Sequence, residues 1–185
     1  MRELTGIYEA LERIGRIKRT GWIMAKIPND IAESIAEHTM KTVFTAMEIC
    51  REMGLRRSEE KIIKMALIHD LAEAFTSDIP KPVKERVDKG KLEELGMEYI
   101  KTIIKDEELI NLYEEYIKGG SVEAKIVDLA DTIATYIQSV NYRAQYGIRT
   151  EHLEAIIEHT GRSSIEKAEK LGLKVDSIVK KLIGI

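Results

Sequence analysis

The chain has 185 residues, 44% of them hydrophobic and 33% charged, and a net charge of −3. This length suits one domain with its own core, so we expect a single domain over 1–185. The only cysteine, Cys50, excludes an intrachain disulfide framework and a thiolate zinc site. No run of apolar residues approaches the length of a membrane-spanning helix. The net negative charge is unsuited to a protein that binds nucleic acid over a broad face. We expect a cytoplasmic protein with no membrane and no nucleic-acid partner.

The first half of the chain predicts three main helices. Apolar residues at helical spacing predict the first over about 3–18. Asp30 is a suitable N-cap for a second helix, which Gly54 ends. A third helix, capped by Ser58, is expected to continue without a break through KIIKMALIHDLAEAF at 61–75. This segment is apolar on most sides, which is typical of a helix central to the core.

The second half of the chain also predicts helices and no strand. Charged amphipathic helices are expected over about 92–117, at the periphery. A glycine pair at 119–120 interrupts the chain, and Ser121 caps a long helix that extends to about Tyr146. One or two amphipathic helices follow from Thr150. The fold class is therefore all-α, a bundle of about seven to eight helices.

Histidines and aspartates recur on three of these helices. His38 lies on the second, His69 and Asp70 on the third, and Asp128 and Asp131 on the long one. A buried carboxylate is costly unless something compensates its charge. A His-Asp dipeptide alone is more often a structural hydrogen-bonded pair, but this set also suits a metal. Nitrogen and oxygen donors without sulfur favour Mn, Co, Ni, Fe or Zn over calcium.

The order H…HD…D, with HDLAE at 69–73 and VDLAD at 127–131, resembles the HD-domain superfamily of metal-dependent phosphohydrolases. The 5′-deoxynucleotidase branch is similar over four further stretches, which are KRTGW at 18–22, SIAEH at 34–38, LIHDLAEAFTSDIPKPVK at 67–84 and ADTIATYIQ at 130–138. The similarity covers roughly residues 7 to 147. It implies an HD-domain helical bundle with one divalent transition metal in the core. It also implies a homodimer that hydrolyses deoxynucleoside 5′-monophosphates to deoxynucleoside and phosphate.

The resemblance implies four metal ligands: His38, His69, Asp70 and Asp131. Asp128 is the alternative for the last ligand, since it lies three residues earlier on nearly the same helix face. Glu73 matches the residue that activates the attacking water. In a continuous helix Glu73 would lie on the same side as His69 and Asp70, which agrees with that role. The other interpretation is an ordinary solvated glutamate.

Other matched positions imply substrate contacts. Arg19 matches a phosphate-binding arginine, and Trp22 is expected to pack against the sugar. Asp78 is expected to contact the sugar or assist the leaving group, although a turn-forming aspartate before proline is a competing interpretation. Lys81 and Lys84 could add phosphate affinity, but solvated loop lysines are the better interpretation.

Several aromatic and histidine side chains are expected to be structural. His152 and His159 are seven residues apart, which is the spacing of one face of a packing or surface helix. The tyrosines of the long helix are expected in the core or an interface; they are Tyr136, Tyr142 and Tyr146. Three rival hypotheses stay open: a regulatory metal-binding module without turnover, a phosphohydrolase acting on another phosphorylated nucleotide, and a helical scaffold without metal.

Overall fold

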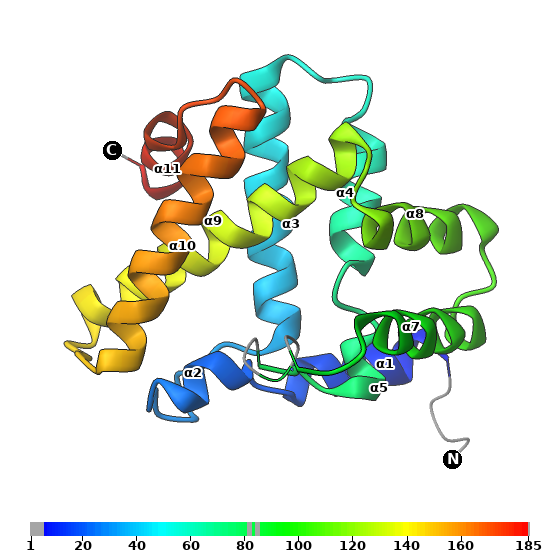
Figure 1. Ribbon diagram of the computed structural model, residues 1–185, viewed down its shortest axis with the longest axis horizontal. Helices are drawn as coiled ribbons and strands as arrows, with labels where there is room; N and C mark the ends of the chain where they lie inside the picture. Colours follow the sequence, from blue (N-terminus) through cyan, green and yellow to red (C-terminus); the bar gives the residue numbers. More distant parts are fainter. Residues whose placement is uncertain (1–5, 81–82, 84–85, 185) are drawn as a thin grey trace.

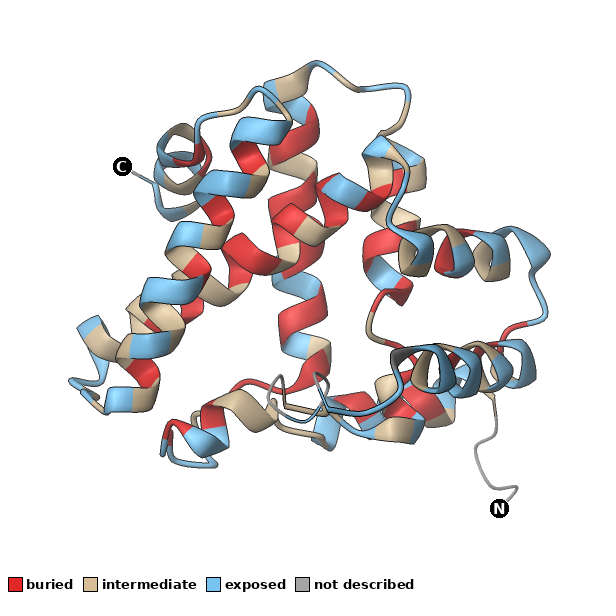
Figure 2. Cartoon of the chain, viewed as in Figure 1, coloured by how far each residue is buried: buried red, intermediate tan, exposed pale blue. Residues whose placement is uncertain are grey.

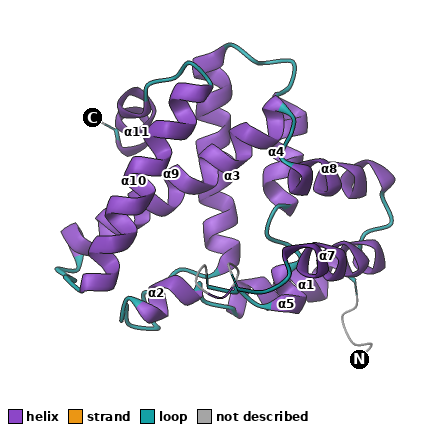
Figure 3. Ribbon diagram, viewed as in Figure 1, coloured by secondary structure: helices purple, strands orange, loops and turns teal. Residues whose placement is uncertain are grey.

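The computed structural model describes residues 6–80, 83 and 86–184, so the predictions for Lys81 and Lys84 lie outside the described residues. The described part contains helices and no strand (Figures 1 and 3). Its ten helices are α1 (Ile7–Arg16), α2 (Thr20–Met24), α3 (Ile35–Met53), α4 (Glu59–Ile68), α5 (Glu73–Thr76), α7 (Lys89–Ile103), α8 (Glu107–Lys118), α9 (Val122–Gln145), α10 (Glu151–Lys170) and α11 (Val175–Ile183). Among them none is long and apolar enough to cross a membrane. The all-α prediction is confirmed; α2 and α5, of five and four residues, raise the number of helices above the expected seven to eight.

Helices α3 and α9 form the centre of the bundle. Helix α9 packs against α3 on one side and α10 on the other, and α4 packs against α3. Figure 2 shows buried residues gathered where these helices face one another. Fully buried side chains include Ile35 and Ile49 of α3, Ile62 of α4, and Ile126 and Ile133 of α9. The charged helices α7 and α8 lie at the edge, as their pattern predicts (Figure 1).

The prediction that α3 begins after Asp30 is wrong. The helix begins at Ile35, and Ser34 caps it. The Ser34 side chain accepts a hydrogen bond from the Glu37 amide at 3.2 Å, and the Glu37 carboxylate accepts one from the Ser34 amide at 2.6 Å. Such a capping box satisfies two backbone donors that a helix end leaves free. Glu33, three residues after Asp30, instead binds Trp22 and Lys41.

An extended segment before α3 sets the position of two side chains that matter below. The Ile35 amide donates to the Ile17 carbonyl at 3.0 Å, and the Arg19 amide donates to the Glu33 carbonyl at 3.1 Å. Lys18 and Ser34 form the bridge between the two antiparallel stretches. This pairing places Arg19 and Glu33 beside each other at the start of α3, one turn before His38.

The predicted continuous helix over 61–75 is also wrong. Helix α4 ends at Ile68, a turn follows, and the short helix α5 begins at Glu73. His69 Nδ1 lies 2.6 Å from the Ala66 carbonyl oxygen, which is the oxygen that the Asp70 amide would bond in a continuing helix. The Glu73 amide instead donates to the Asp70 carbonyl at 3.0 Å, a tighter three-residue turn. The His-Asp pair therefore lies at a helix end.

Most of the predicted helix ends agree with the structure. Gly54, with φ of 67°, ends α3 in the left-handed conformation that favours glycine. Ser121 caps α9 and Thr150 caps α10, each with its side chain accepting from a backbone amide three residues on. Ser58 is at the N-cap position of α4, but its side chain makes no capping hydrogen bond.

Helix α1 packs on the core through Ala10 and Ile14. Ala10 is fully buried and Ile14 is 3% exposed, whereas Leu11 is 46% exposed. The small alanine side chain lets α1 approach its neighbours closely, and a larger residue at that position would not fit the same packing.

Candidate metal centre

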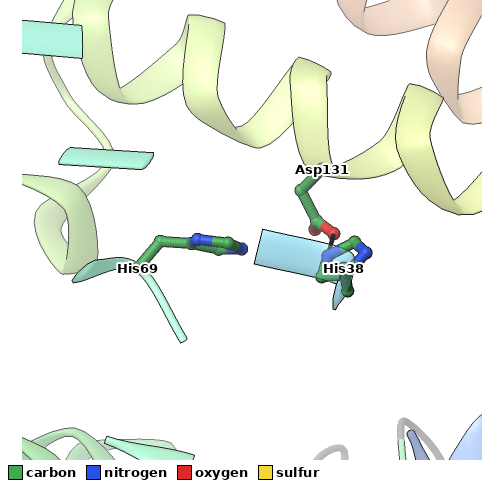
Figure 4. A group of neighbouring side chains, drawn as sticks. All are labelled: His38, His69 and Asp131. Atoms are coloured by element: carbon green, nitrogen blue, oxygen red, sulfur yellow. Dashed lines mark hydrogen bonds and ion pairs between the residues drawn. The ribbon is translucent and has the colours of Figure 1, made fainter. Parts of the chain in front are cut away.

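Two histidines and one aspartate converge between the central helices. His38 comes from α3, His69 from the end of α4 and Asp131 from α9. One ligand atom of each lies within 4.8 Å of the other two. Figure 4 shows the His69 ring directed toward His38, with Asp131 reaching down from α9 to the His38 ring. Three helices thus supply donors to one point, as metal sites in helical bundles do.

Asp70 lies at the same place, and Asp128 does not. Asp70 Oδ2 is 3.1 Å from His69 Nε2 and 3.8 Å from His38 Nε2. Asp131 Oδ1 is 2.8 Å from His38 Nε2. Asp128 instead pairs with Lys167 of α10, whose Nζ lies 2.7 Å from its Oδ1. The geometry therefore favours Asp131 over Asp128 as the aspartate of α9 that faces the histidines.

The donor set fits a divalent cation. Because the Ala66 carbonyl can only accept, His69 Nδ1 carries a proton and donates it there, so Nε2 is the nitrogen whose lone pair is available to a cation when the ring is neutral. That Nε2 atom is buried and makes no hydrogen bond of normal geometry with the described residues, although Asp70 Oδ2 lies 3.1 Å away. A buried polar atom without a partner is costly. A cation bound between this lone pair and the carboxylates would satisfy it.

At the metal centre, the pKa values of His69, Asp70 and Asp131 are shifted toward the charged forms. Burial opposes protonation of His69, but the adjacent Asp70 outweighs it and raises the pKa of His69 to about 9. Burial also opposes ionisation of Asp70 and Asp131. The histidines nevertheless hold the pKa of each carboxyl well below its usual range, His69 acting chiefly on Asp70 and His38 on Asp131. Both carboxylates are thus ionised, which is the form that binds a metal.

Arg19 contacts Nδ1 of His38 and lies 3.9 Å from Asp131 Oδ1 through its Nη2. Its Nη1 lies 2.8 Å from His38 Nδ1 and donates to Thr135 Oγ1 at 2.9 Å. Burial lowers the pKa of Arg19, but Asp131 and Glu33 outweigh burial and raise it above its usual value. Arg19 therefore stays a cation beside the proposed ligands, where a phosphate group would need one.

Sequence reasoning missed Glu33, which the structure places behind His38. The Glu33 side chain is buried, and its Oε1 lies 3.6 Å from His38 Nδ1. Trp22 Nε1 donates to Oε1 at 3.0 Å, and Lys41 Nζ donates to Oε2 at 2.6 Å. Burial opposes its ionisation, but contacts with His38, Arg19 and Lys41 lower the pKa of Glu33 to about 2. The only sequence signal was a glutamate five residues before His38.

Trp22 and Asp78 both lie near Arg19. The Trp22 ring is 2% exposed and packs edge-on against Tyr142, with ring centres 5.2 Å apart. Asp78 Oδ2 accepts a hydrogen bond from the Thr20 amide at 2.5 Å, and the Asp78 carbonyl accepts one from Thr20 Oγ1 at 2.6 Å. Asp78 thus joins the loop after α5 to the start of α2, next to Arg19.

Two cavities border the centre. The first, here called the Arg19 cavity, has a volume of about 650 Å³ and is lined by Arg19, Trp22, Asp78, Asp131, Thr135 and residues of α10. The second, the Glu73 cavity, has a volume of about 780 Å³ and is lined by His69, Asp70, Glu73, Tyr116, Lys125 and Asp128, among others. Since Asp131 lines one cavity and Asp70 the other, the converging donors lie between the two.

The remaining predicted residues are placed as follows. His152 and His159 are outside the metal group found among the described residues, and both line the Arg19 cavity. Tyr142 is fully buried and Tyr146 is 51% exposed. Sequence reasoning also missed Tyr116, whose ring lies edge-on to His69 at 5.7 Å between centres and helps to enclose it.

Comparisons with known proteins identify the family and the fold. A family model described as an HD domain matches residues 11–171. The 5′-deoxynucleotidase HDDC2 of Danio rerio is 30% identical over 165 residues, which are 87% of this chain and 79% of that protein. A conserved hypothetical protein from Pyrococcus furiosus has a TM-score of 0.72 at 26% identity, covering 96% of this chain and 95% of that one. The PH0347 protein from Pyrococcus horikoshii has a TM-score of 0.70 at 29% identity, covering 92% and 95%.

Proposed function

The chain belongs to the HD-domain family, and we propose that it is a metal-dependent 5′-deoxynucleotidase, which hydrolyses deoxynucleoside 5′-monophosphates to deoxynucleoside and phosphate. The observation that carries this proposal is the buried His69 Nε2, which lacks a hydrogen-bond partner among the described residues. It lies among two ionised carboxylates and a second histidine, with a cavity on each side. The named activity of the Danio rerio relative supports the substrate class.

Four residues would hold the metal: His38, His69, Asp70 and Asp131. When bound, a divalent transition metal such as Mn, Co, Ni, Fe or Zn would supply Lewis acidity to a phosphate oxygen and lower the pKa of a water molecule. His69 would bind through Nε2, because its Nδ1 is committed to the Ala66 carbonyl, and His38 would bind through Nε2, which faces Asp131. The identity of the native metal is left to the metal screen below.

The phosphate and nucleoside would bind in the Arg19 cavity. This cavity has the Arg19 guanidinium beside Asp131, and a guanidinium matches two phosphate oxygens in shape and charge. Asp78 and Trp22 line the same cavity and would contact the sugar side. The far wall is α10, with the cavity-lining side chains His152, Ile156, His159 and Ser163, and would face the base.

Glu73 would act from the opposite cavity. It begins α5, in the turn that also presents His69 and Asp70, and it lines the Glu73 cavity with them. A displacement at phosphorus needs the attacking and leaving oxygens roughly in line, on opposite sides. This requirement would be met if Glu73 held the water on one side of the phosphate and the nucleoside left into the Arg19 cavity on the other. Glu73 would accept the proton of that water.

The test of the function is phosphate release from dAMP, dCMP, dGMP, dTMP and dUMP and from their ribose counterparts, each with Mn, Co, Ni, Fe and Zn. We expect turnover of deoxynucleotides with at least one metal. Metal binding without turnover of any monophosphate would instead favour the regulatory metal-binding module, or a different phosphorylated nucleotide. Absence of any metal binding would favour the helical scaffold and reject the site.

Arg19→Ala is expected to raise KM for the nucleotide about 10- to 100-fold, the worth of a lost charge-assisted hydrogen bond, with a smaller effect on kcat. The matched control is Arg16→Ala, since Arg16 is an exposed arginine of α1 that pairs with Glu12. Steady-state kinetics of both variants would check this. A KM for Arg19→Ala equal to that of Arg16→Ala would remove Arg19 from the phosphate site.

We also propose that the chain forms a homodimer, as the family resemblance implies and as symmetric pairing of helical proteins commonly provides. Light scattering at micromolar concentration is expected to give twice the 21.1 kDa chain mass. A single-chain mass across that concentration range would contradict the dimer. A cytoplasmic location and the absence of a nucleic-acid partner stay predictions from the sequence.

A further inference from the structure

The two nitrogens of His38 face different surroundings. Nε2 faces the proposed ligands, 2.8 Å from Asp131 Oδ1 and 3.8 Å from Asp70 Oδ2. Nδ1 faces away from them, 2.8 Å from Arg19 Nη1 and 3.6 Å from Glu33 Oε1. A guanidinium can only donate, so Nδ1 accepts from Arg19 in this arrangement. The single proton of the neutral ring then lies on Nε2 and is donated to Asp131.

Coordination through Nε2 requires the other tautomer. A neutral imidazole binds a metal through its unprotonated nitrogen, so the ring proton must then lie on Nδ1. Arg19 has no lone pair to accept that proton. Glu33 Oε1 does, and the 3.6 Å separation needs to close by only roughly 0.7 Å to reach the usual hydrogen-bond length of about 2.9 Å.

Glu33 is held ready for this contact. Trp22 Nε1 fixes Oε1 and Lys41 Nζ fixes Oε2, so the carboxylate has little freedom to turn away. A carboxylate oxygen has two lone-pair sites, and Oε1 uses one for Trp22. Lys41 is itself held by Gln138 Oε1 at 2.7 Å, which ties the carboxylate to α9.

We propose that Glu33 is a positioning residue of the metal centre: it accepts the Nδ1 proton of His38 when Nε2 is a ligand, and replaces Arg19 at that nitrogen. Arg19 Nη1 then loses its acceptor on His38 and turns toward the phosphate in the Arg19 cavity. Metal binding and phosphate binding are thereby coupled through one ring. The proposal rests on the proposed function only in requiring that His38 is a metal ligand.

The first test is the affinity of chelator-stripped protein for Mn²⁺, measured by titration calorimetry without substrate. Glu33→Gln is expected to weaken binding about 10- to 100-fold, as loss of a histidine-orienting partner does. Glu37→Gln makes the same change in the carboxylate that caps α3 at Ser34. This control is expected to change the affinity far less.

Equal affinities for Glu33→Gln and the wild type would overturn the proposal, and so would an equally large loss in Glu37→Gln. The outcome is independent of catalysis, because an inactive protein can still be titrated with metal. Thermal melting of both variants, monitored by circular dichroism, identifies any that fail to fold.

The second test uses the wild type and needs no variant of Glu33. Nitrogen NMR of ¹⁵N-histidine protein distinguishes Nδ1–H from Nε2–H rings, and Zn²⁺ is diamagnetic. We expect His38 to change from Nε2–H in the stripped protein to Nδ1–H with Zn²⁺, while His69 carries a proton on Nδ1 in both states. His152→Gln and His159→Gln assign the other two rings. A His38 ring that keeps the same tautomer in both states contradicts the exchange.

Discussion

Glu73→Ala is expected to lower kcat by about two to four orders of magnitude while the protein keeps its metal, because removal of a general base typically costs that much. Glu73 begins α5 and shares the turn with His69 and Asp70, so its carboxylate lines the cavity on the side away from Arg19. Substrate binding should change little, since phosphate contact falls to the metal and Arg19. The measurement is steady-state phosphate release with saturating nucleotide, beside metal content from the same preparation.

The matched control for this change is Glu107→Ala. Glu107 is another first-turn glutamate, at the start of α8, and it is exposed. Its loss should leave turnover unchanged. Near wild-type turnover in Glu73→Ala would reject its role as base. Loss of metal together with turnover would instead make Glu73 a ligand or a support of the His69 turn.

His69→Ala and Asp70→Ala are each expected to lose the metal and with it all measurable turnover. His69 contributes the buried Nε2 that has no protein hydrogen-bond partner among the described residues, and Asp70 contributes the oxygen closest to it, at 3.1 Å. Removing either leaves the remaining donors too few to hold a divalent ion tightly. Elemental analysis of the purified variants, with titration of Mn, Co and Ni, measures the loss directly.

Two substitutions serve as controls for metal content. His152→Ala removes a histidine outside the metal group, and Asp128→Ala removes the alternative aspartate of α9. Both are expected to retain about one metal per chain, as the wild type does. Metal loss in Asp128→Ala with retention in Asp131→Ala would reverse the assignment of the fourth ligand. A wild type that takes up none of these ions would refute the site.

The helices and their ends could largely be predicted from the sequence. Gly54, Ser121 and Thr150 mark ends that the structure shares, because a helix end depends on residues within about four positions. The candidate ligands could be named for a similar reason, since histidines and aspartates in apolar helices are unusual enough to be noticed individually. Their order along the chain also carried the family resemblance.

The sequence pattern predicted two helix ends wrongly. Asp30 and Ser34 are both suitable N-caps, but α3 begins after Ser34 because residues 33–35 pair with the extended stretch before α2. The helical pattern through 61–75 concealed the end of α4 at Ile68, since apolar spacing alone does not report that the His69 ring binds the Ala66 carbonyl.

The composition of the centre was decided only by the tertiary structure. Asp128 and Asp131 are equivalent by spacing, but His38 lies against one and Lys167 against the other, across separations of 93 and 39 residues. Arg19 meets Thr135 across 116 residues. Glu33, buried behind His38, had no local signal beyond its position five residues before that histidine. Contacts between residues so far apart depend on how α3, α9 and α10 pack. The periodicity of side chains within one helix shows which face is buried, but not which neighbouring helix covers that face.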